Sequence, residues 1–199
     1  MKKIANQKGF TLFEIVVALS VFAMATIFVS DIFVKINASQ RKVAAIQKVQ
    51  SDARFAMEAI SREVKQGRID YSYYPNGTVA SPVTELAILD ALERRIIFKK
   101  ETEAGSCPAP STAPCLLVSI DRGETWVNLL AQDLKLAEVN FYVSPSTDPF
   151  SFDPATGAFG PNFQPRVTIV LAVETGAADT ASEKKIYLET TISSRMYKR

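Results

Sequence analysis

The feature that most constrains this chain of 199 residues is an apolar stretch close to its N-terminus. From Phe10 to Ser30 there are 21 residues and a single ionisable side chain, that of Glu14. A helix rises about 1.5 Å per residue, so this stretch is roughly 31 Å long when helical, which matches the hydrocarbon core of a bilayer. The sequence therefore predicts a helix that can cross a membrane.

The charges on either side of this stretch predict its orientation. Residues 1–9 contain three lysines and no acid, whereas Asp31 and Lys35 follow the stretch. The positive-inside rule places the basic segment in the cytoplasm. We therefore expect a single-pass protein of the inner (cytoplasmic) membrane whose C-terminal domain is extracytoplasmic.

A cleaved secretory signal peptide is the alternative interpretation of this N-terminus. Ala23-Met24-Ala25 has the small-x-small pattern that a signal peptidase recognises. The apolar run nevertheless continues through this segment to Val29, where a secretory signal has a polar, turn-prone segment. Glu14 also counts against it, because a charge at mid-bilayer depth costs about 2.5–3.5 kcal/mol and a plain export signal gains nothing from it.

The segment that enters the apolar stretch is Lys8-Gly9-Phe10-Thr11-Leu12-Phe13-Glu14. Together with the apolar residues up to Val34, it resembles the type IV prepilin signal, which type IV pilins and type II secretion pseudopilins share. The resemblance implies that a membrane-embedded prepilin peptidase cuts between Gly9 and Phe10 and methylates the new amine of Phe10. It also implies that Glu14 is the acid of the family signal.

The same resemblance implies partners and a destination. The partners are other pilin or pseudopilin subunits, the prepilin peptidase and an inner-membrane assembly platform, and the destination is a pilus or pseudopilus. Within the family, the chain length, a cysteine-clamped hairpin and the runs 166–171 and 190–195 resemble minor pilins and minor pseudopilins of the J or W kind. Such subunits prime or cap assembly.

The charge of Glu14 suggests how assembly selects its register. After cleavage, the ammonium group of Phe10 and the carboxylate of Glu14 are opposite charges in a low-dielectric setting, where each is costly alone and cheaper when paired. We therefore expect Glu14 of one chain to pair with the amine of a neighbour. A buried polar pair of this kind fixes the axial register of packed helices.

The apolar stretch leads into a longer helical pattern. No Pro or Gly occurs between Phe10 and Gln66, and Gly67 is expected to cap the helix at its C-terminal end. Residues 10–34 form the membrane and filament-core half, and residues 35–66 form an amphipathic half with one apolar face toward a domain. The apolar positions of this second half recur at steps of three and four: Ile46, Val49, Ala53, Met57, Ile60 and Val64.

Residues 67–199 predict a head made of β-strands. The expected strands are Arg95–Lys99, Cys115–Ile120, Thr125–Leu129, Leu136–Ser144, Arg166–Thr175 and Lys185–Ser194. Residues 73–77 read as a turn, and residues 80–91 as an irregular connector with one short helical or extended piece. The sum is an α+β pilin fold in which a long N-terminal helix packs on an antiparallel β-sheet.

A Pro-rich insertion at residues 145–165 separates two of these strands. Its aromatic residues Phe150 and Phe152 either contact a partner subunit or pack under the loop. Asp148 and Asp153 raise calcium as an alternative, but their spacing matches no calcium-loop pattern, so we expect no cofactor and no metal.

Cys107 and Cys115 are the only cysteines. Because the head is expected to be exported, a disulfide between them is the default. A redox or metal role is the rival, but the chain has no C-x-x-C motif and no His to complete a metal site.

Composition excludes several functional classes. The absence of His removes the common hydrolase triads and the usual general base, and no nucleotide-binding or nucleophile motif is present, so we expect no enzyme. A net charge of +2 is too small for a nucleic-acid partner. Two functions remain: a subunit of a filament, or a membrane-anchored extracytoplasmic binding module that is not incorporated in a filament.

Overall fold

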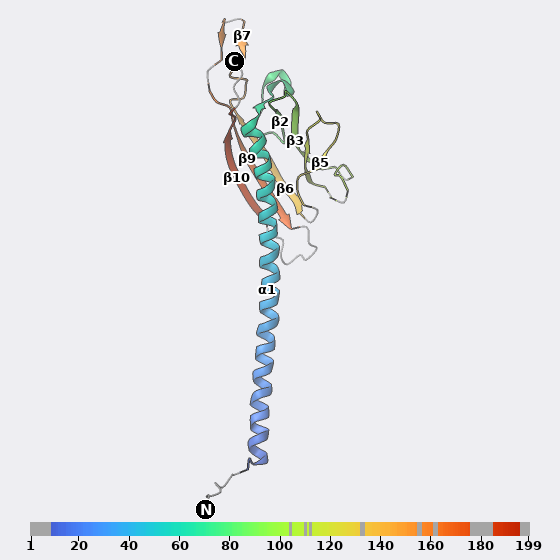
Figure 1. The fold of residues 1–199 in the computed structure, drawn as a ribbon, viewed down its shortest axis with the longest axis vertical. Helices are drawn as coiled ribbons and strands as arrows, with labels where there is room; N and C mark the ends of the chain where they lie inside the picture. The colour runs from blue at the N-terminus through green and yellow to red at the C-terminus, as the bar shows by residue number, and fades with distance from the viewer. Residues whose placement is uncertain are drawn as a thin grey trace, which may run out of the picture. The chain divides into compact units, whose positions relative to one another are not determined.

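The computed structural model describes residues 9–103, 105–109, 111, 113–131, 134–154, 157–160, 163–175 and 185–195 (Figure 1). The chain divides into two compact units, residues 1–44 and residues 45–199. The helix α1, Leu12–Gln66, contributes residues to both units. No helix-breaking residue interrupts α1, as the absence of Pro and Gly predicts.

In the second unit, α1 presents an apolar face to the head. The buried residues of this part of the helix follow the predicted stripe with Ala56 added, and Ile46 is half-buried. They are Val49, Ala53, Ala56, Met57, Ile60 and Val64. Their spacing of three and four residues places them on one side of the helix. This is the side that the amphipathic pattern predicts to be buried.

Five strands form one antiparallel sheet. They are β1 (Arg68–Ile69), β2 (Glu85–Leu89), β3 (Arg95–Glu101), β4 (Cys115–Ser119) and β5 (Val127–Asn128), paired in that order. Strands β3, β4 and β5 are the meander that the sequence predicts, and β1 and β2 extend it. Strand β2 lies within the expected connector, and its central residues Leu86, Ala87 and Ile88 are all buried. A strand covered on both faces has no alternating pattern, which explains why the sequence signal is weak there.

Strand β5 is shorter than the predicted strand Thr125–Leu129. The reason is the turn before it, where the carboxylate of Asp121 accepts hydrogen bonds from the backbone amides of Glu124 and Thr125 at 3.1 and 2.9 Å. These hydrogen bonds keep the first residues of the predicted strand in the turn. A hydrogen bond from the hydroxyl of Ser119, together with hydrogen bonds from the hydroxyl and the amide of Thr125, holds the pKa of Asp121 below its usual range.

Three long strands form a second antiparallel sheet. They are β6 (Leu134–Ser144), β9 (Arg166–Thr175) and β10 (Lys185–Ser193), in the order β10-β9-β6. The single sheet that we expected is therefore two sheets. Between them, the described residues show one isolated bridge, Val83 with Phe141, because β6 meets the five-stranded sheet over a short segment only.

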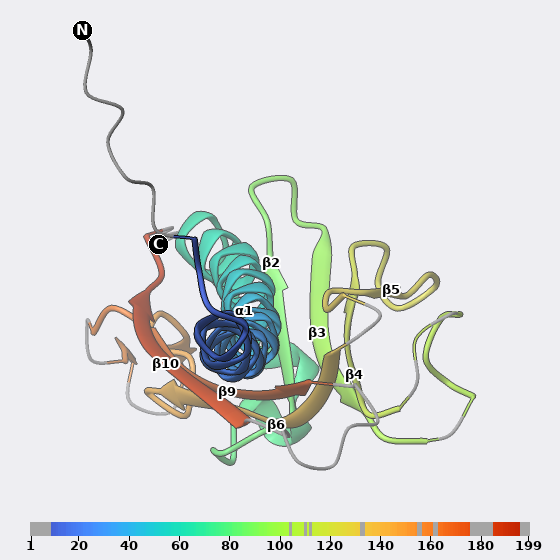
Figure 2. The ribbon, with the colours of Figure 1, turned by 90° about the horizontal axis from the view of Figure 1, so that it is seen from below.

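The two sheets cover two sides of the C-terminal part of α1 (Figure 2). The helix and both sheets contribute large, completely buried side chains to one core: Phe98, Phe141, Ile60, Leu86, Ile88, Leu116, Leu136, Ile169 and Leu171. The α+β architecture is confirmed.

Two tyrosines after α1 connect this segment to the insertion and to β2. Residues 71–77 form two short 3₁₀ helices, η1 (Tyr71–Tyr73) and η2 (Pro75–Gly77), at the predicted turn. The hydroxyl of Tyr71 donates to the carbonyl of Pro145 at 3.0 Å, and that of Tyr74 donates to the carbonyl of Glu85 at 3.1 Å. Both rings are buried in the core, and burial raises the pKa of Tyr74 to about 12.

The insertion 145–165 contains a two-stranded hairpin of β7 (Phe152–Asp153) and β8 (Ala158–Phe159). Phe152 and Phe159 are exposed and lie edge to face, with ring centroids 5.2 Å apart. Phe150 is half-buried. Phe152 is therefore not packed under the loop, and contact of the exposed rings with a partner subunit stays a prediction.

The end of α1 is fastened by the end of the last strand. The hydroxyl of Ser194, which is buried, donates to the carbonyl of Gly67 at 2.6 Å, and the amide of Arg195 donates to the carbonyl of Lys65 at 3.3 Å. These bonds satisfy carbonyl groups that the helix terminus leaves without partners. These hydrogen bonds join the segment after β10 to the C-terminal end of α1.

Gly67 follows the helix as predicted, and its amide donates to the carbonyl of Glu63 at 2.8 Å. Its backbone angle is not in the left-handed region. A Cβ atom at Gly67 would lie 2.4 Å from Cγ2 of Ile88 and 2.7 Å from the carbonyl oxygen of Leu89. Glycine is required here because β2 passes too close for any side chain.

We expect Gly67→Ala to destabilise the head by about 1–3 kcal/mol, because the added methyl group must displace β2 from the end of α1. Chemical unfolding of the detergent-solubilised chain, followed by the fluorescence of its single tryptophan, measures the change. Gly77→Asn is the control, since Gly77 has open space around it and asparagine tolerates its left-handed backbone. Equal stability of the two variants would contradict the close-approach explanation.

Candidate assembly site at the start of the helix

The predicted cleavage point lies immediately before the helix. Gly9 and Phe10 are exposed, and neither belongs to a helix or strand. A Cβ atom at Gly9 would meet no other atom within 4 Å. The backbone on both sides of the Gly9–Phe10 bond is therefore accessible, as a protease substrate requires.

Thr11 caps the first turn of α1. Its hydroxyl oxygen accepts a hydrogen bond from the amide of Glu14 at 3.3 Å, and its carbonyl accepts one from the amide of Ile15 at 3.2 Å. A helix starts with amide groups that have no partner within the helix, and the Thr11 side chain satisfies one of them. This cap explains why the helix begins at Leu12, two residues after the start that the apolar pattern suggests.

Glu14 stands in this first turn with its side chain exposed. Negative charge is favourable at a helix N-terminus because it opposes the positive end of the helix dipole. Among the residues that the structure describes, no ion pair involves Glu14, whereas Asp31 at the far end of the stretch pairs with Lys35 at 2.7 Å. Glu14 is thus the one acid of residues 10–30, and it is available to a cation from outside the described chain.

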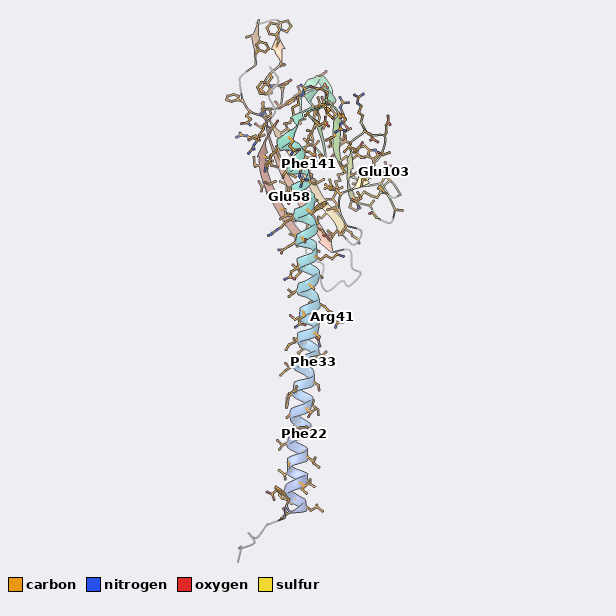
Figure 3. The ribbon with its side chains drawn as sticks, viewed as in Figure 1. Phe22, Phe33, Arg41, Glu58, Glu103 and Phe141 are labelled. Carbon is orange, nitrogen blue, oxygen red and sulfur yellow. A yellow bond between two sulfur atoms is a disulfide. The ribbon has the colours of Figure 1, made fainter. Side chains whose placement is uncertain are left out.

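The rest of this helical segment presents apolar side chains on all sides, including Phe22 and Phe33 (Figure 3). Its hydroxyl groups are satisfied within the helix: Ser20 donates to the carbonyl of Val17, Thr26 to that of Phe22 and Ser30 to that of Thr26, at 2.8–2.9 Å. By length and composition, α1 is able to cross a membrane. A surface of this kind is stable only in lipid or against other apolar helices.

Comparison with protein families agrees with this geometry. Residues 4–30 match the family model of the prokaryotic N-terminal methylation motif. The chain carries a prepilin-type signal. No curated protein matches the chain significantly, and no solved structure does.

The prepilin-type signal has general consequences for the whole chain. It is typical of pilin and pseudopilin precursors, which a prepilin peptidase processes and which assemble with other pilin subunits. It therefore indicates a structural protein with a membrane-anchoring segment. The signal covers the start of the chain and says nothing of how the head is used.

The head contains the predicted disulfide. The sulfur atoms of Cys107 and Cys115 are bonded, with their Cα atoms 6.2 Å apart. Both cysteines are buried and form a small second core with Leu117, against which Trp126 packs. The ammonium group of Lys99 lies 4.5 Å from the centre of the Trp126 ring. The disulfide thus holds the loop 107–115 against the outer strands of the five-stranded sheet.

No calcium site is built by the residues that the structure describes, which contain no group of three potential metal ligands. The carboxylate of Asp148 accepts a hydrogen bond of 2.9 Å from the amide of Phe150, within its own loop. The side chain of Asp153 lies outside the described atoms. The calcium alternative stays a prediction.

Thr11 is the residue that our sequence interpretation missed. The signal was present, because Thr11-Leu12-Phe13-Glu14 has the spacing of a capping box, in which a Thr and an acid three residues later precede an apolar run. Glu14 therefore belongs both to this local pattern and to the prepilin-type signal.

We expect Thr11→Val to loosen the first turn of α1 by about 1 kcal/mol, because the Glu14 amide loses its acceptor. Amide hydrogen exchange of Glu14 in detergent micelles measures this directly and should become faster. Thr26→Val is the matched control: its hydroxyl donates to a carbonyl that already belongs to the helix, so exchange at Glu14 should not change. Unaltered exchange in Thr11→Val would show that Thr11 does not cap the helix.

Proposed function

We propose that this chain is a structural subunit of a type IV pilus or a type II secretion pseudopilus. It waits in the inner membrane as a single-pass protein and is then assembled into the filament. Its prepilin peptidase cleaves between Gly9 and Phe10 and methylates the amine of Phe10. The head, residues 67–199, is extracytoplasmic.

The observation that carries this proposal is the environment of Glu14. A lone carboxylate stands in the first turn of a helix whose surface is otherwise apolar, four residues after the new N-terminus that cleavage would create. In lipid it is costly, and the amine of Phe10 on a neighbouring chain is the cation that the processing step supplies. Proteolysis thereby creates the partner that assembly needs.

The orientation is supported by the charges that flank the apolar stretch. Three lysines precede it, within the segment that cleavage would remove. The disulfide in the head agrees with an oxidising compartment on the opposite side of the membrane.

A minor role is the finer part of this proposal. In it, a few copies prime or cap the filament at an inner-membrane assembly platform. It is supported by the resemblance of the chain to minor pilins and minor pseudopilins of the J or W kind in its length, its clamped hairpin and the runs 166–171 and 190–195.

Mass spectrometry of the chain from membranes and from sheared fibres tests both parts of the proposal. We expect an N-terminal peptide that begins with N-methylated Phe10, present in fibres at low abundance relative to the main subunit. An intact Met1 in a host with active peptidase would instead indicate a membrane-anchored binding module, and a start after Ala25 would indicate secretion. A chain that dominates the fibres would exclude the minor role alone.

We expect Glu14→Ala to reduce the amount of the chain in fibres while membrane insertion and cleavage remain, because the apolar stretch and the Gly9–Phe10 bond are unchanged. Immunoblots of membrane and fibre fractions measure the distribution. Asp31→Ala is the control, since Asp31 already has a partner in its own chain. If the Glu14→Ala variant enters fibres as efficiently as the unchanged chain, the proposed pairing is refuted.

A further inference from the structure

Strand β10 forms an open edge of the three-stranded sheet. All of its residues pair with β9, and among the residues that the structure describes no strand pairs with its other side. Figure 2 shows β10 at the outer edge of this sheet. A strand rises about 3.3 Å per residue, so the edge presents roughly 30 Å of backbone whose outward amide and carbonyl groups are free to pair with another strand.

The other sheet edges that the structure describes are protected. Strands β1 and β5, at the two ends of the five-stranded sheet, have two residues each, and so have β7 and β8. Strand β6 has a bulge between Leu136 and Glu138. Its outer edge is occupied by Val83, whose amide donates to the carbonyl of Phe141 at 2.9 Å. Short strands, bulges and covering segments are the means by which proteins prevent unwanted strand pairing.

Strand β10 has none of these protections within its described length. It contains no Pro, and its register with β9 is continuous from Lys185 to Ser193. Its one lysine, Lys185, stands at its start, with the ammonium group 5.1 Å from the centre of the Tyr187 ring. The side chains that alternate toward the core carry no charge: Ile186, Leu188, Thr190 and Ile192. The edge is therefore open to a partner strand.

The side chains of β10 indicate the composition of that partner strand. Ile186 and Leu188 pack against the core but are only half-buried, so an added strand with an apolar inner face would cover them further. On the outer face, the carboxylate of Glu189 is exposed and lies opposite Val170 of β9. Among the described residues it has no ion pair. A Lys or Arg directly across from Glu189 on the added strand would supply the missing charge.

Glu189 also argues against a second copy of this chain as the partner. It is the central residue of β10. When two copies of β10 pair antiparallel over their full length, the two Glu189 carboxylates are directly opposite each other, and like charges in this position destabilise the pair. A minor subunit is moreover present in few copies, so the subunits around it are mostly of other kinds.

We infer that the open edge of β10 binds an extended strand of a different subunit of the filament, which becomes the fourth strand of this sheet. The strand is apolar on the face toward the core and carries a Lys or Arg opposite Glu189. Main-chain hydrogen bonds provide the affinity, and the alternating side chains provide the specificity. The assignment to a filament subunit rests on the proposed function, whereas the binding of a strand does not.

A peptide that copies β9 tests the edge. Residues 166–175 already pair with β10 in the folded head, and Val170→Lys in the peptide places a cation opposite Glu189 in the same register. We expect the fluorescently labelled peptide to bind the detergent-solubilised chain, as measured by fluorescence anisotropy. Glu189→Lys in the chain should weaken this binding about fivefold. The peptide with Val170→Glu should show the reverse preference. Absence of binding, or equal binding to both chains, would overturn the inference.

Two controls accompany this measurement. Glu124→Lys makes the same charge change at an exposed residue of the turn before β5, so peptide binding should not change. Tyr187→Cys combined with Thr191→Cys tests self-pairing, because these two positions face each other in antiparallel copies centred on Glu189. The chain's own two cysteines are already bonded to each other. We expect no disulfide-linked dimer on non-reducing gels, and such a dimer would overturn the assignment to a different subunit.

The amount of the chain in fibres tests the source of the strand. Glu189→Lys should unfold at the same temperature as the unchanged chain, since Glu189 is exposed, and it should be cleaved normally. Its amount in fibres should fall about fivefold, whereas that of Glu124→Lys should not change. Normal incorporation of Glu189→Lys would overturn the filament subunit as the partner. An unprocessed N-terminus would overturn the proposed function and this assignment with it, while peptide binding in detergent tests the edge independently of both.

Discussion

Burial of one stripe of α1 is the interaction on which the head depends. The buried residues of α1 between Val49 and Val64 belong to the same core as residues of both sheets. A three-stranded sheet or a short meander alone buries little apolar surface in water. The N-terminal part of the same helix belongs to the prepilin-type signal. One element therefore both organises the fold and takes part in the processing signal.

Much of this fold was predictable because its local patterns are strong. Strand β9 has the predicted bounds, Arg166–Thr175, and β10 alternates in burial as its sequence alternates. The rest depended on long-range packing. Strand β2 is covered on both faces and so lacks a period, and the division into two sheets depends on which strands pair, a fact that no single strand encodes. The requirement for glycine at position 67 could not be predicted either, because it arises from the close approach of β2 in the folded head.

The candidate assembly site was predictable for a different reason. Gly9, Phe10 and Glu14 lie within one short segment, so their chemistry can be read from adjacent letters. The capping role of Thr11 could be predicted from the same segment, because Thr11 and Glu14 have the spacing of a capping box. A groove at the end of α1 is of the opposite kind, because its lining residues Glu63, Leu92 and Ile120 come from three segments that only the folded head brings together. Motifs of adjacent residues thus indicate how a chain is processed, whereas surfaces for partners form only when the chain folds.

The bond between Ser194 and Gly67 joins residues 127 positions apart in the chain. The helix is synthesised long before the residues that close on it, so the apolar stripe of α1 has no complete cover until residue 194 has been added to the chain. The order of synthesis, and not only the final free energy, is therefore a condition under which this sequence has to fold.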